Sequence, residues 1–177
     1  MSQIIFLHGA SSSGKSTLAK VLQARLEKPF LHIPLDHLRD SGILPMSRFK
    51  SGEFAWADVR EAVFNGFHAS LAAYADAGND LILEHILDTN EWMTALRKLL
   101  SSHNVFFVAV HCRLDVLIER EKLRGDRRLG SAKRDFETIH VGKLYDLELD
   151  GEDGAEANVE RLLIAWRSTE RASSFDN

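Results

Sequence analysis

A glycine-rich segment near the start of the chain restricts the fold more than any other feature. Residues 9–16 read Gly-Ala-Ser-Ser-Ser-Gly-Lys-Ser and match the pattern G-x-x-x-x-G-K-[ST] without a mismatch. Strand-forming apolar residues at 3–7 precede it, and apolar residues recur at helical spacing from 15 to 26. A strand, a glycine loop and a helix in this order predict the opening of a βαβ unit.

The residue types in this loop suit the binding of phosphate groups. Gly9 and Gly14 let backbone N–H groups approach phosphate oxygens with no side chain in the way. The helix that begins near Lys15 directs the positive end of its dipole at the same anion. Lys15 would reach the outer phosphates and is predicted to be catalytic, while the Ser16 hydroxyl can ligate Mg²⁺. The alternative is a flexible turn that binds nothing. The predicted ATP-binding residues are Gly9, Ala10, Ser11, Ser12, Ser13, Gly14, Lys15, Ser16 and Thr17.

Strand-like and helix-like segments alternate along the rest of the chain. Four more strands are predicted, at 30–35, 80–84, 105–111 and 145–150. Helices are predicted over 54–77, from Asp88 onward with Glu91 as its capping partner, within 115–135 and over 155–167. Unbroken apolar strands suit a sheet covered on both faces. The sequence therefore predicts an open, mostly parallel α/β sheet.

Length and charge limit the classes of protein to which this chain could belong. A chain of 177 residues suits a single domain over 1–177, with an irregular stretch at 40–52 and a loose polar tail at 168–177. The formal net charge of −4 argues against a nucleic-acid or membrane-surface partner. No basic leader and no apolar run near ~20 residues is seen, which predicts a cytoplasmic protein. The sequence leaves a homo-oligomer open.

Two acids stand where the second and third predicted strands end. In open α/β sheets, ligands bind beyond the carboxyl ends of the strands. Asp36 follows the second strand and could accept a proton from an acceptor hydroxyl, or hold a Mg²⁺-bound water; the alternative is a helix cap. Glu84 ends the third strand, where it could serve the metal together with Ser16; the alternative is a solvent-facing charge. We predict that Asp36 is catalytic and that Ser16 and Glu84 form the metal site.

Basic residues cluster beyond the fourth predicted strand, namely Arg120, Lys122, Arg124, Arg127 and Arg128. Phosphoryl transfer spreads negative charge over the moving group, and arginines that close over it stabilise that charge. Because Gly125 interrupts the helical pattern, we predict a lid over 115–135 in which Arg124 and Arg127 are catalytic. The alternative is a solvated helix face on which Glu119 and Glu121 partner the basic residues.

Taken together, these segments resemble one known family, the chloramphenicol phosphotransferase-like P-loop kinases. The resemblance spans roughly residues 3–166 and includes the serine-rich loop, the Leu35-Asp36 step and the third strand. Its most particular part is a series of residues in the second half of the chain: Arg124-Gly125-Asp126-Arg127, Gly130, His140, Gly142, Tyr145, Asp146, Glu148 and Asp150.

The family implies a fold like that of nucleotide and shikimate kinases, with a five-stranded parallel sheet flanked by helices. It implies ATP as phosphoryl donor and a hydroxylated small molecule as acceptor, and it suggests an antibiotic such as chloramphenicol. It also implies Asp36 as the base, and Arg124 and Arg127 as lid arginines. The chain departs from the family at Glu84-His85, where paired aspartates are usual, and over 38–60, which shapes the acceptor pocket.

The prediction is therefore an ATP- and Mg²⁺-dependent small-molecule O-phosphotransferase. Two alternatives stay open. One is a metabolic kinase of the shikimate or nucleoside-monophosphate type, with the same fold and another acceptor. The other is an ATP-binding regulatory or toxin-like P-loop protein that transfers nothing.

Overall fold

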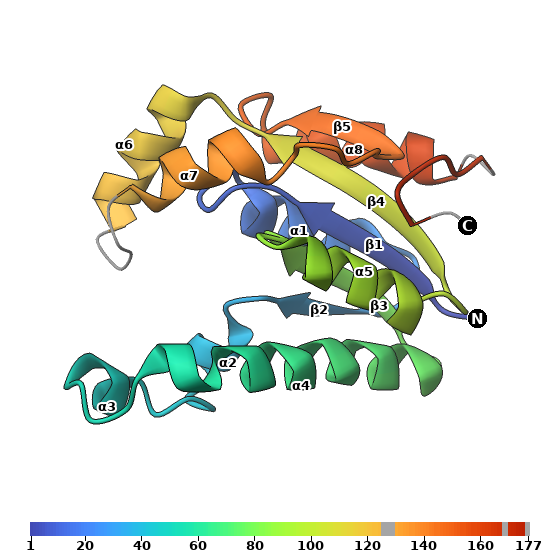
Figure 1. Ribbon diagram of the computed structural model, residues 1–177. Coiled ribbons are helices and arrows are strands. Elements are labelled where there is room, and N and C mark those ends of the chain that lie inside the picture. The colour runs from blue at the N-terminus through green and yellow to red at the C-terminus, as the bar shows by residue number, and fades with distance from the viewer. Residues whose placement is uncertain (125–129, 168–169, 176–177) are drawn as a thin grey trace.

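A parallel sheet forms the centre of the molecule (Figure 1). The structure is a computed structural model and describes residues 1–124, 130–167 and 170–175. In this part of the chain the sheet has the order β2-β3-β1-β4-β5, and every neighbouring pair is parallel. Its strands are β1 (Gln3–His8), β2 (Phe30–Pro34), β3 (Asp80–His85), β4 (Asn104–His111) and β5 (Leu147–Asp150). The predicted five-stranded parallel sheet is confirmed.

Helices pack on both faces of this sheet. Those described are α1 (Lys15–Arg25), α2 (His37–Asp40), α3 (Met46–Lys50), α4 (Trp56–Asp76), α5 (Asn90–Leu99), α6 (Leu114–Arg124), α7 (Ser131–Thr138) and α8 (Ala155–Trp166). Figure 1 shows α4 and α5 on the near face, with α1 and α8 behind the sheet. No described helix is long and apolar enough to cross a membrane.

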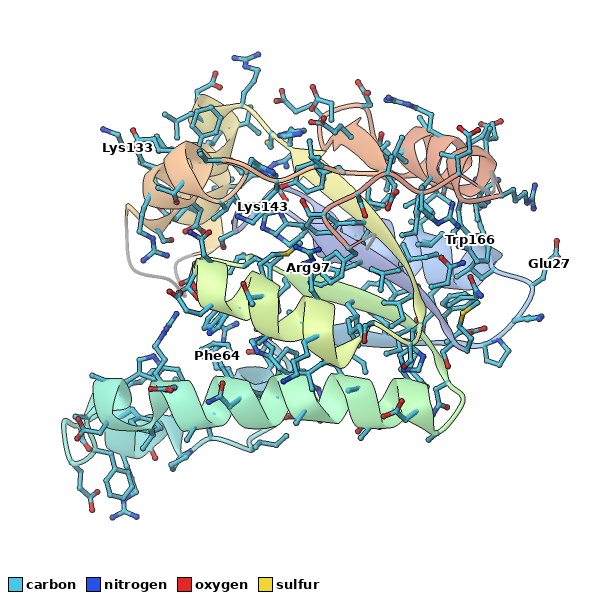
Figure 2. All side chains as sticks on the ribbon, turned by 45° about the vertical axis from the view of Figure 1, so that its right-hand side comes forward. Glu27, Phe64, Arg97, Lys133, Lys143 and Trp166 are labelled. Atoms are coloured by element: carbon cyan, nitrogen blue, oxygen red, sulfur yellow. The ribbon has the colours of Figure 1, made fainter. Side chains whose placement is uncertain are left out.

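Alternation along the strands builds two separate apolar layers. In β1, Ile4 and Phe6 join the layer under α4 and α5, whereas Ile5 and Leu7 join the layer under α1 and α8. On the first side, Phe64 of α4 points toward α5 (Figure 2), where its ring centroid lies 4.2 Å from that of Trp92. Because both faces are buried, the strands carry the continuous apolar runs that the sequence shows.

The structure adds detail to two predicted segments. The stretch 40–52 contains the short helix α3, and α2 lies just before it. The region 115–135, where an interrupted helical segment is predicted, contains α6 and the first part of α7. The expected break at Gly125 lies outside the described residues.

The start of α5 corrects the predicted cap. The helix begins at Asn90, and Thr89 is its N-cap, with Oγ1 accepting a hydrogen bond of 3.2 Å from the Trp92 N–H. Asp88 instead accepts hydrogen bonds from Nη2 of Arg60, at 3.1 and 2.9 Å. A threonine one position later satisfies the first turn, so the Asp88–Glu91 capping pair was wrong.

The C-terminal segment packs back onto the sheet where a loose tail was expected. The Phe175 ring centroid lies 5.3 Å from that of Phe6 and 5.0 Å from that of Phe107. The Ala172 N–H donates to Asp146 at 2.9 Å. An aromatic side chain near the end of a polar segment therefore supplies part of the apolar layer.

Candidate active site

The glycine-rich segment forms a tight loop between β1 and α1. A Cβ atom added to Gly9 would lie 2.4 Å from the carbonyl oxygen of Val110, so no side chain fits there. Gly14 has a φ of 101°, in the left-handed region, directly before α1 begins. The first turn of α1 leaves backbone N–H groups without intrahelical acceptors, which suits an anion. Both glycines are therefore required by the shape of the loop.

The Lys15 side chain folds back against this loop. It is only 8% exposed, and Nζ donates hydrogen bonds of 2.7 Å to the carbonyl oxygens of Gly9 and Ala10. Ser13 Oγ lies 3.5 Å from the same Nζ. The loop thus holds a positive charge close to its own N–H donors, which makes the local potential favourable for phosphate.

Glu84 connects the end of β3 to α1 and to β2. Its Oε2 accepts a hydrogen bond of 2.7 Å from Ser16 Oγ, and its Oε1 contacts Nε2 of His32. Burial raises the pKa of this carboxyl, but the hydrogen bonds from His32 and Ser16 and the charge of Lys15 together hold the pKa below its usual value. Glu84 is therefore an ionised, buried acceptor rather than a solvent-facing strand end.

The neighbouring residue, His85, faces the other side of the sheet. Its Nδ1 accepts from the Leu87 N–H at 2.9 Å, so its Nε2 carries the hydrogen and donates to Nε2 of His68 at 3.0 Å. Burial lowers the pKa of His68 to about 4, and burial together with the charges of His68 and Lys15 lowers the pKa of His85 further below its usual range. The side chains of Glu84 and His85 therefore make their hydrogen bonds on opposite sides of the sheet.

Asp36 follows β2 at the N-cap position of α2. Its side chain makes no capping hydrogen bond, and a carboxylate oxygen lies 3.7 Å from Nη2 of Arg39. The side chain is 34% exposed. The structure shows no helix-capping hydrogen bond for this carboxylate, and Asp36 is among the residues that line the strand-end pocket.

That pocket, of about 520 Å³, lies at the carboxyl ends of the strands. It gathers side chains from the loop, from the ends of β2 and β3 and from α6; these include Lys15, Ser16, Asp36, Glu84 and Arg120. Ser11, Ser12, Gly14 and Thr17 of the predicted ATP-binding set also line it, whereas Gly9, Ala10 and Ser13 do not. The structure therefore places most of the predicted phosphate-binding residues around one pocket, together with the predicted metal and base residues.

The arginines predicted to lie on a lid are described only in part. Arg124 is the last residue of α6 and its side chain is not described, and Arg127 lies outside the described residues. Arg120 reaches the loop, with Nη1 donating to the Ser12 carbonyl oxygen at 3.2 Å. Glu121 accepts hydrogen bonds of 2.9 Å from the N–H groups of Gly130 and Ala132, so it joins α6 to the start of α7.

Sequence reasoning missed two features of the site. His32 reads as an ordinary strand residue, and only the register between β2 and β3 brings it to Glu84. Gly151 reads as a turn glycine, yet a Cβ atom there would lie 2.1 Å from the Ser13 carbonyl oxygen. The turn after β5 is thus packed directly on the phosphate loop.

A histidine–tyrosine chain lies behind the loop. His8 Nε2 donates to the Ile86 carbonyl oxygen at 2.8 Å, so its Nδ1 accepts from the Tyr145 hydroxyl at 2.9 Å. His140 Nδ1 then donates to the same hydroxyl oxygen at 2.8 Å. Burial, with the charges of His111, Lys143 and Lys15, lowers the pKa of His140 to about 3. The lowered pKa values of His8 and His140 leave both rings neutral.

The sheet order and the loop define a P-loop kinase fold, and solved structures agree. Shikimate kinase from Aquifex aeolicus superposes with a TM-score of 0.61 at 25% identity, covering 93% of this chain and 96% of that one. The APS kinase of Mycobacterium tuberculosis, in complex with AMPPNP and APS, gives a TM-score of 0.64 at 21% identity, covering 94% and 98%.

The sequence itself fixes the family within that class. The family model of chloramphenicol phosphotransferase-like proteins matches residues 2–165, and the chain belongs to this family. A relative from Mycobacterium tuberculosis that carries the provisional name O-phosphotransferase is 26% identical over 167 residues, spanning 84% of this chain and 74% of the relative. The predicted family is confirmed, and the chain is a kinase.

Proposed function

We propose that this protein transfers the γ-phosphoryl group of Mg–ATP to a hydroxyl group of a small molecule. The observation that carries this proposal is the single pocket that holds Lys15, the Ser16–Glu84 pair and Asp36. Phosphoryl transfer needs a phosphate cradle, a metal position and a group that takes the acceptor's proton. The pocket contains a candidate for each.

On the donor side, the loop and Lys15 would bind the phosphates. Ser16 and Glu84 offer hard oxygen atoms, which are the ligands that Mg²⁺ prefers, so the residues present fit this ion. When bound, Mg²⁺ would neutralise charge on the phosphate oxygens. Arg120 lies at the loop and would add positive charge near the transferred group, with Arg124 and Arg127 as further candidates on the lid over 115–135.

On the acceptor side, Asp36 would act as the general base. Its carboxylate would take the hydroxyl proton as the acceptor oxygen bonds to the γ-phosphorus and the bond to ADP breaks. The family name favours an antibiotic such as chloramphenicol as acceptor, and residues 38–60 would shape its pocket.

A two-part experiment tests the proposal. The protein is incubated with Mg–ATP and a library of hydroxylated antibiotics, sugars and metabolites, and mass spectrometry identifies any species that gains one phosphate. The Asp36→Asn variant is expected to lose most turnover while calorimetry still shows ATP binding. Full turnover in this variant would show that Asp36 is not the base.

The same library separates the alternatives. Because shikimate kinase shares the fold at 25% identity, phosphorylation of a cyclic metabolite in place of every antibiotic would favour a metabolic kinase. ATP binding without transfer to any acceptor would favour a regulatory protein and would count against the proposal.

A further inference from the structure

Three side chains from three elements form one hydrogen-bonded chain at the metal position. His32 lies in β2, Glu84 in β3 and Ser16 in the first turn of α1. His32 pairs in register with Ile82, and Pro34 with Glu84, so His32 and Glu84 project from the same face of the sheet. Ile82 belongs to the apolar layer under α1, which places this face against the helix that carries Ser16.

The hydrogens in this chain can be assigned. An ionised carboxylate only accepts hydrogen bonds, so both His32 Nε2 and Ser16 Oγ must donate to Glu84. Ser16 has a single hydroxyl hydrogen, and it lies on the Glu84 side. The lone pairs of Ser16 Oγ are therefore left available for a cation.

His32 determines which way Glu84 can face. The carboxylate is 4% exposed, and its two oxygens are divided between the imidazole and the hydroxyl. The His32 side chain is 13% exposed, so little solvent competes with this contact. A buried polar pair costs desolvation that an apolar pair would avoid, and the residue paired with His32 in the next strand is the apolar Ile82.

We propose that His32 is a positioning residue for the metal of Mg–ATP: through Glu84 it orients the Ser16 hydroxyl so that its oxygen lone pairs meet the ion. This inference rests on the proposed function. Partners that orient metal ligands typically affect metal affinity or activity 10- to 100-fold, and the same range, about 10- to 100-fold, is expected here.

The test uses two variants of similar size and one control. His32→Leu fills the space without a donor, whereas His32→Gln keeps an N–H donor. Leu31→Ala changes an exposed neighbour in the same strand. For each full-length protein, calorimetry measures AMPPNP affinity in EDTA and across a magnesium titration, and thermal unfolding monitors stability.

His32→Leu is expected to raise the Mg²⁺ concentration for half-maximal enhancement of binding about 10- to 100-fold, with affinity in EDTA unchanged. His32→Gln should recover most of this loss, and Leu31→Ala should behave as wild type. A merely structural role would lower both affinities in parallel, and that result would overturn the inference, as would a wild-type magnesium response in His32→Leu.

The outcomes also separate this inference from the proposed function. If wild-type protein binds no nucleotide, both fail. If it binds Mg–AMPPNP with the expected His32 dependence but phosphorylates no acceptor, the proposed function fails and the role of His32 stands.

Discussion

The loop side and the strand-end side of the pocket are built in different ways. Residues 9–17 are consecutive, and their glycines, lysine and serine shape one loop with one helix start. The strand-end side takes Asp36 from after β2 and Glu84 from β3, and depends on partners such as His32 in another strand. The residues of the loop side are consecutive in the sequence. The residues of the strand-end side come together only when the strands pair in the correct register.

Strand geometry also explains why two adjacent residues, Glu84 and His85, have different partners. Glu84 and His85 follow each other, yet they face opposite layers because side chains alternate along a strand. Glu84 accepts a hydrogen bond from Ser16 of α1, whereas His85 is hydrogen-bonded to His68 of α4. The two side chains therefore belong to different environments although they are adjacent in sequence.

The largest expected effect tests the loop side. Lys15→Ala removes the charge held 2.7 Å from two loop carbonyls, and kcat should fall by about 10³-fold because transition-state charge loses its main partner. Steady-state kinetics with the acceptor found in the library screen measures it. The matched control is Lys20→Ala, an exposed residue of α1, which should change kcat less than about twofold. Equal losses would show that the effect is not specific to the loop.

A second pair of variants tests whether the loop depends on residues outside 9–17. Gly151→Ala places a Cβ atom 2.1 Å from the Ser13 carbonyl oxygen and 3.1 Å from that of His111. Such overpacking against backbone should lower the free energy of unfolding by about 1–3 kcal/mol and weaken nucleotide binding. Urea unfolding and calorimetry measure the two effects.

Gly66→Ala is the control for that pair. Gly66 lies in α4 with no atom within 4 Å of an added Cβ, so the change should stabilise the protein by up to about 1 kcal/mol. If Gly151→Ala matched this control, the close packing of the β5 turn on the loop would be refuted.

Much of the architecture could be predicted from the sequence because it depends on local patterns. Apolar runs and alternation located all five strands, and the loop motif located one side of the pocket. The pairing of His32 with Glu84 could not be predicted from the sequence, because it depends on the register between β2 and β3. The capping of α5 was misassigned by one residue, because Asp88 and Thr89 are both good caps and only their partners, Arg60 and the Trp92 N–H, separate them.

A third prediction concerns the chain behind the loop. The pKa of His140 is about 3 in the folded protein against 6.5 for an ordinary histidine, so between these values the unfolded chain binds more protons. The free energy of unfolding should therefore fall as pH drops below about 6.5, by at most about 1.4 kcal/mol per pH unit from this residue. Partial exposure of the ring will make the measured slope smaller.

Urea unfolding at pH 7, 6 and 5 measures that slope. His140→Gln cannot titrate, and it should show a shallower decline than wild type, while His8, His68 and His85 still contribute. Identical slopes would mean that burial and the neighbouring charges do not hold His140 neutral.

The smallest effect separates two neighbouring residues on the strand-end side. Thr89→Ala should cost about 1 kcal/mol of unfolding free energy, because the Trp92 N–H loses its acceptor. Asp88→Ala removes the pair with Arg60, which is partly exposed, and should cost less than about 1 kcal/mol. Hydrogen exchange at the Trp92 amide distinguishes the two: it should speed up in Thr89→Ala and stay unchanged in Asp88→Ala. Faster exchange in Asp88→Ala alone would show that Asp88, and not Thr89, caps α5.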